Sequence, residues 1–274
     1  MSQPYYCLNS QFVEKENLSL GINRAFKFGD GLFETVRLVN GQAQNFSDHI
    51  ERLTEGMKFL KLQFDENFDK TIQLESEQLI RKNKQFKGGV LRIYVFRAGM
   101  GKYTPQSNQL EYLIETEELS ENNYSLNDLG LRVDLAESVS ITPSKFTQLK
   151  SLNALPYVMA SIEKEERLFD DLLLLNDDQQ LVEATSSNIF LVKKNELLTP
   201  PISSGCLSGV MRKRILQIAS SVGLNSKEST ISVDDLLEAD EVFLTNSISG
   251  IRWVGAFRKK RYFHNWAKKL VEKI

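Results

Sequence analysis

The chain has 274 residues, of which 41% are hydrophobic and 26% are charged, and its formal net charge is −2 at pH 7. This composition is typical of a globular protein, and the length favours one large domain or two modest ones. A charge so close to zero excludes a protein that recruits nucleic acid or an anionic membrane through its overall field. We therefore expect neither of these partners.

Targeting and metal-binding signals are also lacking in the sequence. The longest apolar run, Leu172–Leu175, is far too short to cross a bilayer, and the first residues lack the basic patch and apolar stretch of a signal peptide. The two cysteines, Cys7 and Cys206, and the two histidines, His49 and His264, do not occur at metal-ligand spacings. We expect a cytoplasmic protein without a metal centre.

The first half of the chain alternates between strand and helix patterns. A GDG turn (Gly29–Gly31) leads into a strand, and such a glycine pair marks either a tight turn or a close approach of the backbone to a ligand. Residues 5–20 predict two short strands with a turn between them, and further strands are predicted at 32–38, 90–99 and 110–119. The predicted helices cover 48–60 and 66–84. Residues 117–128 are polar and rich in turn-forming residues, as is typical of a linker.

The second half has the same mixture of elements. The predicted strands cover residues 130–138, 171–177, 180–194, 224–232, 241–247 and 251–257, and the predicted helices follow Lys150, begin near 210, cover 233–239 and close the chain. Segregated strands and helices indicate an α+β fold in two domains. We expect a smaller N-terminal α/β domain (1–118), a linker (119–128) and a larger C-terminal domain (129–274) that contains Lys150.

Lys150 is a candidate catalytic residue. It precedes an apolar repeat at helical spacing, formed by Leu155, Val158, Met159 and Ile162. One interpretation is a solvated lysine that happens to precede a helix. The other is a reactive amine at the edge of a packed core, able to form a Schiff base with a carbonyl.

A lysine that binds pyridoxal phosphate needs partners, and the sequence offers a candidate for each. The phosphate needs an arginine and amides at a helix N-terminus, which Arg52 and the residues Val210 and Met211 could supply. The pyridine nitrogen needs a carboxylate, and Glu183 lies where a buried strand meets a run of small residues. Each signal is weak by itself, because glycine loops before helices are common.

Six ordered motifs together resemble those of a known family. They are FGDGLFETVR (28–37), HIERL (49–53), LKSLN (149–153), LVEATSSNIF (181–190), CLSGVMR (206–212) and EVFLTNS (241–247). The chain resembles the class IV, fold-type IV pyridoxal-phosphate enzymes, which include branched-chain aminotransferases, D-amino-acid aminotransferases and aminodeoxychorismate lyases. The resemblance implies a two-domain fold like that of D-amino-acid aminotransferase, pyridoxal 5'-phosphate as cofactor and a homodimer.

The resemblance also assigns roles to residues of this chain. Lys150 matches the catalytic lysine that holds the cofactor covalently and moves the substrate proton. Glu183 matches the carboxylate that pairs with the pyridine nitrogen. The phosphate site corresponds to Arg52, the amides of Val210 and Met211 and the hydroxyl of Ser247, and the cofactor pocket is shaped by Ser187 and Asn188. Many family members also have a tyrosine that bonds the cofactor's phenolic oxygen, but the two usual positions here are Phe33 and Ala154.

The subfamilies differ around the substrate. The short Lys150–Asn153 spacing differs from that of branched-chain aminotransferases, and Arg97 lacks the histidine two residues later that D-amino-acid aminotransferases carry, because that residue is Gly99. The following GKYTP resembles aminodeoxychorismate lyases, which form 4-aminobenzoate and pyruvate. Arg97, Lys102 and Tyr103 are candidate contacts for the substrate carboxylates, or else a solvated loop. A branched-chain or D-amino-acid aminotransferase, and more remotely a non-catalytic relative, remain the alternatives.

Overall fold

The computed structural model describes residues 4–274 and divides into two compact units. Unit 1 extends to Asn123 and also includes Lys150–Asn153, whereas unit 2 comprises Tyr124–Leu149 and Ala154–Ile274. The short segment that contains Lys150 was expected in the C-terminal domain, but its contacts are with unit 1. Within the described residues, none of the helices combines the length and the apolar character that crossing a membrane requires.

Unit 1 is built on a six-stranded antiparallel sheet. Its strands lie in the order β2-β1-β6-β5-β3-β4. They are β1 (Tyr5–Leu8), β2 (Gln11–Glu14), β3 (Gly31–Val39), β4 (Gln42–Ala43), β5 (Gly89–Arg97) and β6 (Leu110–Glu118). The two short strands predicted within residues 5–20 are confirmed, although the second ends at Glu14, and the turn between them lies at Asn9 and Ser10, which both have positive φ. A 3-10 turn, η1 (Lys15–Asn17), follows β2.

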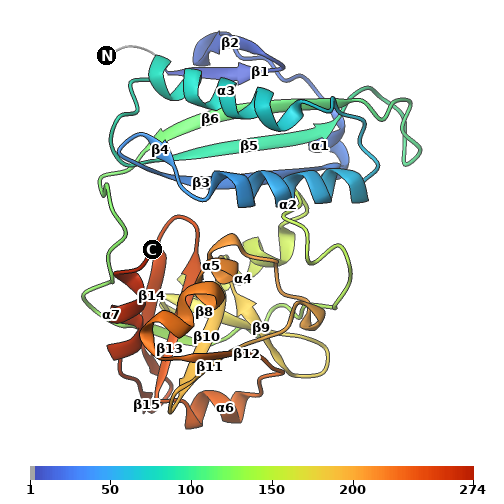
Figure 1. The fold of residues 1–274 in the computed structure, drawn as a ribbon. Coiled ribbons are helices and arrows are strands. Elements are labelled where there is room, and N and C mark those ends of the chain that lie inside the picture. The colour runs from blue at the N-terminus through green and yellow to red at the C-terminus, as the bar shows by residue number, and fades with distance from the viewer. Residues whose placement is uncertain (1–3) are drawn as a thin grey trace. The chain divides into compact units, whose positions relative to one another are not determined.

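The helices of unit 1 are α1 (Arg24–Phe28), α2 (Phe46–Phe59) and α3 (Phe68–Lys82). Helices α2 and α3 pack on the sheet, with α2 against β3 and α3 against β1 and β6 (Figure 1). Alternation along β3 and β5 directs apolar side chains into this layer. The buried side chains there are Leu32, Val36, Leu38, Leu53, Met57, Ile72, Leu79, Leu91, Ile93 and Val95.

Unit 2 contains a nine-stranded mixed sheet. The order is β12-β11-β10-β13-β14-β7-β8-β9, and β15 pairs with β14. The strands are β7 (Leu131–Leu135), β8 (Asp171–Leu175), β9 (Leu181–Ala184), β10 (Asn188–Lys193), β11 (Glu196–Thr199), β12 (Asn225–Glu228), β13 (Glu241–Asn246), β14 (Gly250–Phe257) and β15 (Lys260–Arg261). Strand β8 is buried along nearly all its length, as its continuous leucine run predicts.

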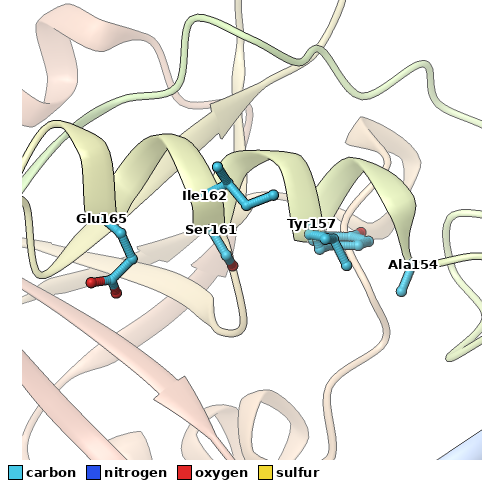
Figure 2. A pocket seen from close by; sticks show the side chains of 6 residues that line it. Ala154, Tyr157, Ser161, Ile162 and Glu165 are labelled. Atoms are coloured by element: carbon cyan, nitrogen blue, oxygen red, sulfur yellow. The ribbon is translucent and has the colours of Figure 1, made fainter.

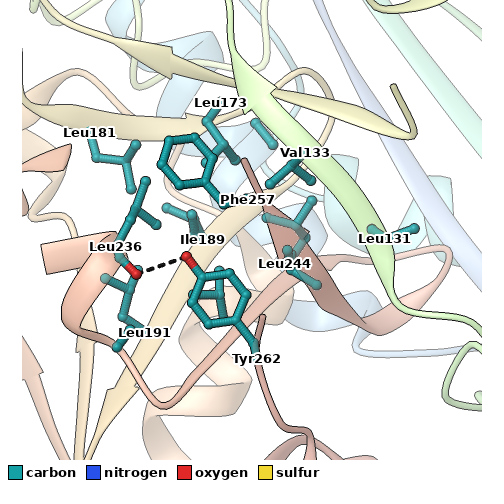
Figure 3. Packing of buried hydrophobic residues seen from close by; sticks show 14 of the residues in the cluster. Leu131, Val133, Leu173, Leu181, Ile189, Leu191, Leu236, Leu244, Phe257 and Tyr262 are labelled. Atoms are coloured by element: carbon teal, nitrogen blue, oxygen red, sulfur yellow. Dashed lines mark hydrogen bonds between the residues drawn. The ribbon is translucent and has the colours of Figure 1, made fainter. Parts of the chain in front are cut away.

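The helices of unit 2 are α4 (Leu155–Glu166), α5 (Val210–Ile218), α6 (Val233–Glu238) and α7 (Asn265–Val271), with 3-10 turns η2 (Ile202–Ser204) and η3 (Ala219–Val222). One core cluster forms around Leu173, Ile189, Leu244 and Phe257, and Tyr262 reaches into it to donate a hydrogen bond to the carbonyl of Leu236 at 2.7 Å (Figure 3). The predicted α+β fold class is confirmed.

Helix α4 differs from expectation in the direction of its apolar face. The stripe Leu155, Val158, Met159 and Ile162 is 43–68% exposed, and it is Ala160 on the other side that is fully buried. The helical prediction is therefore confirmed, but the stripe does not form a packed core. Tyr157, which lies between the two sides, is covered more than the stripe.

Candidate active site

The segment Lys150–Asn153 lies alongside β3 in unit 1. The amide of Phe33 donates to the carbonyl of Lys150 at 2.9 Å, and the amide of Leu152 donates to the carbonyl of Gly31 at 3.1 Å. The Nζ atom of Lys150 lies 4.3 Å from the centre of the Phe33 ring. Since an ammonium group is attracted to an aromatic face, this contact holds the amine above the ring.

The two glycines of the GDG turn explain why the lysine segment can lie so close. Gly29 ends α1 with a left-handed conformation (φ 61°), and a Cβ there would lie 2.6 Å from Oδ1 of Asn153. A Cβ on Gly31 would lie 2.4 Å from the carbonyl oxygen of Val95. The Nδ2 of Asn153 donates to the carbonyl of Gly29 at 3.0 Å. Gly29 therefore serves as a turn residue and also admits the protein's own lysine segment.

Arg52 is held on α2 by the buried carboxylate of Glu34. Its Nε donates to Oε1 of Glu34 at 2.8 Å and its Nη2 donates to Oε2 at 2.5 Å. The Arg52 side chain remains 12% exposed, whereas Glu34 is 1% exposed. Because side chains alternate along a strand, Glu34 points to the opposite face of β3 from Phe33. Phe33, whose ring contacts Lys150, and Glu34, which holds Arg52, are thus adjacent residues of β3 with side chains on opposite faces.

Glu183, on β9 of unit 2, is 3% exposed and accepts several hydrogen bonds. Oε1 accepts from the hydroxyl of Tyr157 at 2.7 Å. Oε2 accepts from the amide of Leu207 at 3.1 Å and from Nδ2 of Asn188 at 3.3 Å. A buried carboxylate stays charged only when such donors replace water. Unit 2 therefore brings the predicted residues Glu183 and Asn188 together.

The loop before α5 is fixed to the same asparagine. Nδ2 of Asn188 also donates to the carbonyl of Leu207 at 2.9 Å. Gly209 is the N-cap of α5, and a Cβ there would lie 1.9 Å from Oδ1 of Asn188. The backbone can therefore follow this path only with glycine. The amides of Val210 and Met211 belong to the first turn, where a helix has no internal acceptors and can bind an anion.

Two predicted serines flank neighbouring strands of the same unit, with Ser187 just before β10 and Ser247 just after β13. The hydroxyl of Ser187 accepts a hydrogen bond from Nδ2 of Asn246 at 3.0 Å. The carbonyl of Ser247 accepts from the hydroxyl of Tyr124 at 2.9 Å. Strands β10 and β13 are neighbours, with Asn188 opposite Thr245. This pairing positions the two serine-containing segments beside each other.

Arg97 is buried and engaged in unit 1. Its Nε donates to Oδ2 of Asp30 at 3.0 Å, its Nη2 donates to the carbonyl of Leu60 at 2.7 Å, and its Nη1 donates to Asn108. Asp30 also pairs with Arg24 at 2.7 Å. Asp30 thus joins two buried guanidinium groups at the end of β3. A role of Arg97 in substrate binding stays a prediction, and it would require Arg97 to give up one of these partners.

Lys102 and Tyr103 lie in the loop after β5. The carbonyl of Lys102 accepts a hydrogen bond from Nη1 of Arg24 at 2.7 Å, which fixes the loop backbone to α1. The Tyr103 side chain is 91% exposed, and its ring centre lies 5.8 Å from that of Phe28. Both side chains are therefore carried by a loop whose base is anchored, as their proposed contact with a substrate requires.

Sequence reasoning missed Tyr157, Glu34 and Asp30. Tyr157 lies within a helical pattern defined by its apolar stripe, and that spacing does not predict a partner for the tyrosine hydroxyl. Glu34 and Asp30 belong to the FGDGLFETVR motif, but no spacing rule predicts that one would hold Arg52 and the other Arg97. A charged residue at a core-facing position of a strand is the available signal for Glu34.

The comparisons with known proteins agree over nearly the whole chain. The class IV amino-transferase family model matches residues 31–257. A D-alanine aminotransferase of Bacillus licheniformis is 28% identical over 89% of this chain and 84% of that protein. An aminodeoxychorismate lyase of Vibrio harveyi is 26% identical over 84% of this chain and 83% of that protein. The crystal structure of 4-amino-4-deoxychorismate lyase from Pseudomonas aeruginosa matches with a TM-score of 0.82 and 26% identity, covering 98% of this chain and 97% of that one.

These similarities define a pyridoxal-phosphate-dependent enzyme of the aminotransferase and lyase class, with the fold-type IV architecture. The chain belongs to the class IV aminotransferase family. Enzymes of this family use pyridoxal 5'-phosphate and act on small amino-acid or oxo-acid substrates.

Each unit, taken by itself, offers groups whose chemistry suits this cofactor. Unit 2 has a buried carboxylate, Glu183, for a protonated ring nitrogen, and a helix N-terminus for a phosphate. The backbone can approach Asn188 just before Val210 because Gly209 has no Cβ, which would lie 1.9 Å from Oδ1 of Asn188. Unit 1 has the primary amine of Lys150 beside an aromatic ring and a partly exposed guanidinium at Arg52.

Proposed function

We propose that this enzyme is a 4-amino-4-deoxychorismate lyase, which converts its substrate to 4-aminobenzoate and pyruvate. The observation that carries the proposal is the environment of Arg97. This arginine is engaged by Asp30, Asn108 and the carbonyl of Leu60, and the residue two positions later, Gly99, has no side chain. An Arg-x-His pair for the carboxylate of a D-amino acid is therefore lacking, and the similarity to two lyases supports the same choice.

The predicted residues would supply the covalent anchor, the ring-nitrogen partner and the phosphate contacts of the cofactor. We assign Lys150 as its covalent anchor and Glu183 as the partner of its ring nitrogen. We assign the phosphate to the amides of Val210 and Met211, the hydroxyl of Ser247 and the guanidinium of Arg52. Ser187 and Asn188 would shape the pocket, since Asn188 bonds both Glu183 and the loop before α5.

The chemistry assigned to the chain is proton movement at Lys150. The bound cofactor supplies an electron sink for the carbon that carries the substrate amine. With the cofactor bound, the amine of Lys150 would act as the general base that removes the proton from that carbon. The carbon–oxygen bond to the enolpyruvyl group then breaks, the electron pair leaves with the oxygen, and a proton converts the released enolpyruvate to pyruvate. No oxidant or water is consumed.

The remaining groups would set the electrostatics of this step. Glu183, as a carboxylate without bulk water around it, keeps the ring nitrogen protonated. The Phe33 ring lies under the amine of Lys150 and excludes water from that side. Lys102 and Tyr103 would contact the substrate carboxylates from their anchored loop, and Arg97 would do so only after releasing a present partner.

Transamination is the second candidate, and it rests on the similarity to the Bacillus licheniformis D-alanine aminotransferase. Purified holoenzyme should be incubated separately with 4-amino-4-deoxychorismate, with D-alanine plus 2-oxoglutarate and with leucine plus 2-oxoglutarate. The lyase assignment predicts pyruvate and 4-aminobenzoate in equal amounts from the first mixture and little 2-oxo acid exchange in the other two. Turnover restricted to an amino acid plus 2-oxoglutarate would reject it.

We also propose a homodimer in the cytoplasm. Cys7 and Cys206 are both free and buried, which agrees with a reducing compartment. Light scattering coupled to size-exclusion chromatography should give twice the chain mass of 31.3 kDa. A particle of single-chain mass at working enzyme concentrations would reject the dimer.

A further inference from the structure

Tyr157 lies in the first turn of α4, soon after the lysine segment in sequence but within unit 2. It lines a surface groove of about 430 Å³ together with Ala154, Ser161 and Ile162 (Figure 2). Whereas the groove-lining ring is partly accessible, its hydroxyl is directed to Glu183 and donates to Oε1 at 2.7 Å. The same side chain therefore connects a surface groove to a buried carboxylate.

The two oxygens of Glu183 accept hydrogen bonds from donors in different parts of unit 2. Oε1 accepts from Tyr157, and Oε2 accepts from the loop that precedes α5 and from Asn188. Two fixed points, one on each oxygen, define the rotation of a carboxylate plane. Without the hydroxyl, Oε1 would lose its 2.7 Å charge-assisted hydrogen bond from α4.

The tyrosine is suited to remain a donor. Burial raises the pKa of the Tyr157 hydroxyl, and the negative charge of Glu183 raises this pKa further. The phenol is therefore protonated at every pH at which the enzyme would work, and it cannot become an acceptor that repels the carboxylate.

We propose that Tyr157 is a positioning residue that orients Glu183 toward the ring nitrogen of the cofactor. This inference rests on the proposed function, in which Glu183 pairs with that nitrogen. Tyr157 acts only through Glu183 and contacts no reacting atom. The contribution of Tyr157 to cofactor affinity must therefore depend on the ring nitrogen. A purely structural contribution would be the same whether or not the cofactor has that nitrogen.

The test compares two cofactor probes on protein stripped of cofactor and reconstituted. Pyridoxal 5'-phosphate has the ring nitrogen, and 1-deazapyridoxal 5'-phosphate has a C–H group in its place. Tyr157→Phe should weaken binding of the first probe about tenfold, as expected for one lost charge-assisted hydrogen bond, and leave binding of the second within about twofold. Equal weakening for both probes, or no weakening for either, would overturn the inference.

Tyr262→Phe is the matched control, because Tyr262 is also a buried tyrosine of unit 2 that donates one hydrogen bond, in its case to the carbonyl of Leu236 (Figure 3). It should change neither dissociation constant. Tyr157→Gln, whose amide can donate to the same oxygen, should retain most of the affinity for pyridoxal 5'-phosphate. Tyr157→Gln also serves as a second variant should Tyr157→Phe fail to fold. A tenfold loss of affinity for pyridoxal 5'-phosphate in Tyr157→Gln would count against the inference.

Glu183→Gln separates this inference from the proposed function. If Glu183 pairs with the ring nitrogen, wild-type protein should prefer pyridoxal 5'-phosphate over the deaza probe and Glu183→Gln should lose that preference. Adding Tyr157→Phe to Glu183→Gln should then have little further effect, because the two act as one unit. A wild-type protein with no preference would reject the role of Glu183 itself, whereas a preference that Tyr157→Phe leaves intact would reject only the role of Tyr157.

Discussion

Glu34 binds Arg52 at two points, with distances of 2.8 Å and 2.5 Å between the guanidinium nitrogens and the carboxylate oxygens. Oε2 of the same carboxylate lies 2.6 Å from Nδ1 of His49. Burial alone would raise the pKa of Glu34, but the charge of Arg52 and the hydrogen bonds from His49 and Arg52 outweigh it and lower the pKa to about 2. A residue that we assign to the cofactor phosphate is thus oriented by a charged partner that is itself wholly buried.

Replacing Glu34 by Gln should destabilise the protein by about 3 kcal/mol, because it leaves the charge of Arg52 partly buried without its counter-charge. The free energy of unfolding can be measured by urea titration. Glu75→Gln is the control, since Glu75 is a buried carboxylate of unit 1 that accepts from the hydroxyl of Tyr112 at 2.8 Å and pairs with no arginine in the described structure. Equal losses of unfolding free energy in the two variants would show that the ion pair stabilises the protein no more than the hydrogen bond from the neutral hydroxyl of Tyr112 to Glu75 does.

The same pair predicts how stability depends on pH. The pKa of Glu34 is lowered from 4.5 to about 2 in the folded protein. The contribution of ionised Glu34 to the free energy of unfolding is therefore complete above pH 4.5, the pKa in the unfolded chain. It is lost as the pH falls from 4.5 to about 2, because the unfolded chain binds the proton first. Glu163 in unit 2 has a similarly lowered pKa of about 2, so both carboxylates contribute to the slope of the wild-type free energy of unfolding against pH. Glu34→Gln should make the decline shallower, and an unchanged slope would contradict the assignment.

Lys150→Ala should abolish covalent attachment of the cofactor and reduce turnover by about a thousandfold, because both the anchor and the general base are removed. Borohydride reduction followed by mass spectrometry of peptides should place the cofactor on Lys150 in the wild-type protein only. Lys145→Ala, at an exposed lysine just upstream, is the control and should behave as wild type. Adduct formation on another lysine would displace Lys150 from its proposed role.

Gly209→Ala should disrupt the start of α5, since the new Cβ would lie 1.9 Å from Oδ1 of Asn188. We expect the variant to lose more affinity for pyridoxal 5'-phosphate than for pyridoxal, which has no phosphate to bind at the helix N-terminus. Calorimetric titration of both compounds measures the difference. Adding Asn188→Ala should recover part of the loss if the clash is its cause. A loss that is equal for the two compounds would indicate general misfolding.

Much of the fold could be predicted from periodicity. The alternation in β5 and the leucine run in β8 gave strands at the observed positions, and α4 begins where the spacing after Lys150 predicts a helix. The positions of helix ends could be predicted less closely than those of the strands. Helix α2 begins at Phe46 after Asn45, which adopts a left-handed conformation and makes no side-chain cap, so no capping signal marked it.

The candidate site was predictable in its residue types but not in its connections. Motif similarity predicts roles for Lys150, Glu183 and Arg52, and these roles stay predictions. The partners of the three side chains depend on which strands become neighbours. Helical spacing likewise identified the apolar stripe of α4 but not the direction in which it points, since several faces of a helix can meet a core. The hydroxyl of Tyr157 and the carboxylate of Glu34 became visible only once the chain was folded.

The segment Lys150–Asn153 completes unit 1, although most of the sequence between Asn123 and the end of the chain belongs to unit 2. The polypeptide therefore leaves unit 1, returns to it for four residues and leaves again. During synthesis, β3 cannot receive its bonds from Lys150 and Leu152 until the ribosome has extended the chain well beyond the first unit. A fragment that ends near Asn123 would present β3 without this partner. The N-terminal unit can therefore form all of its contacts only after part of the second unit has been synthesised.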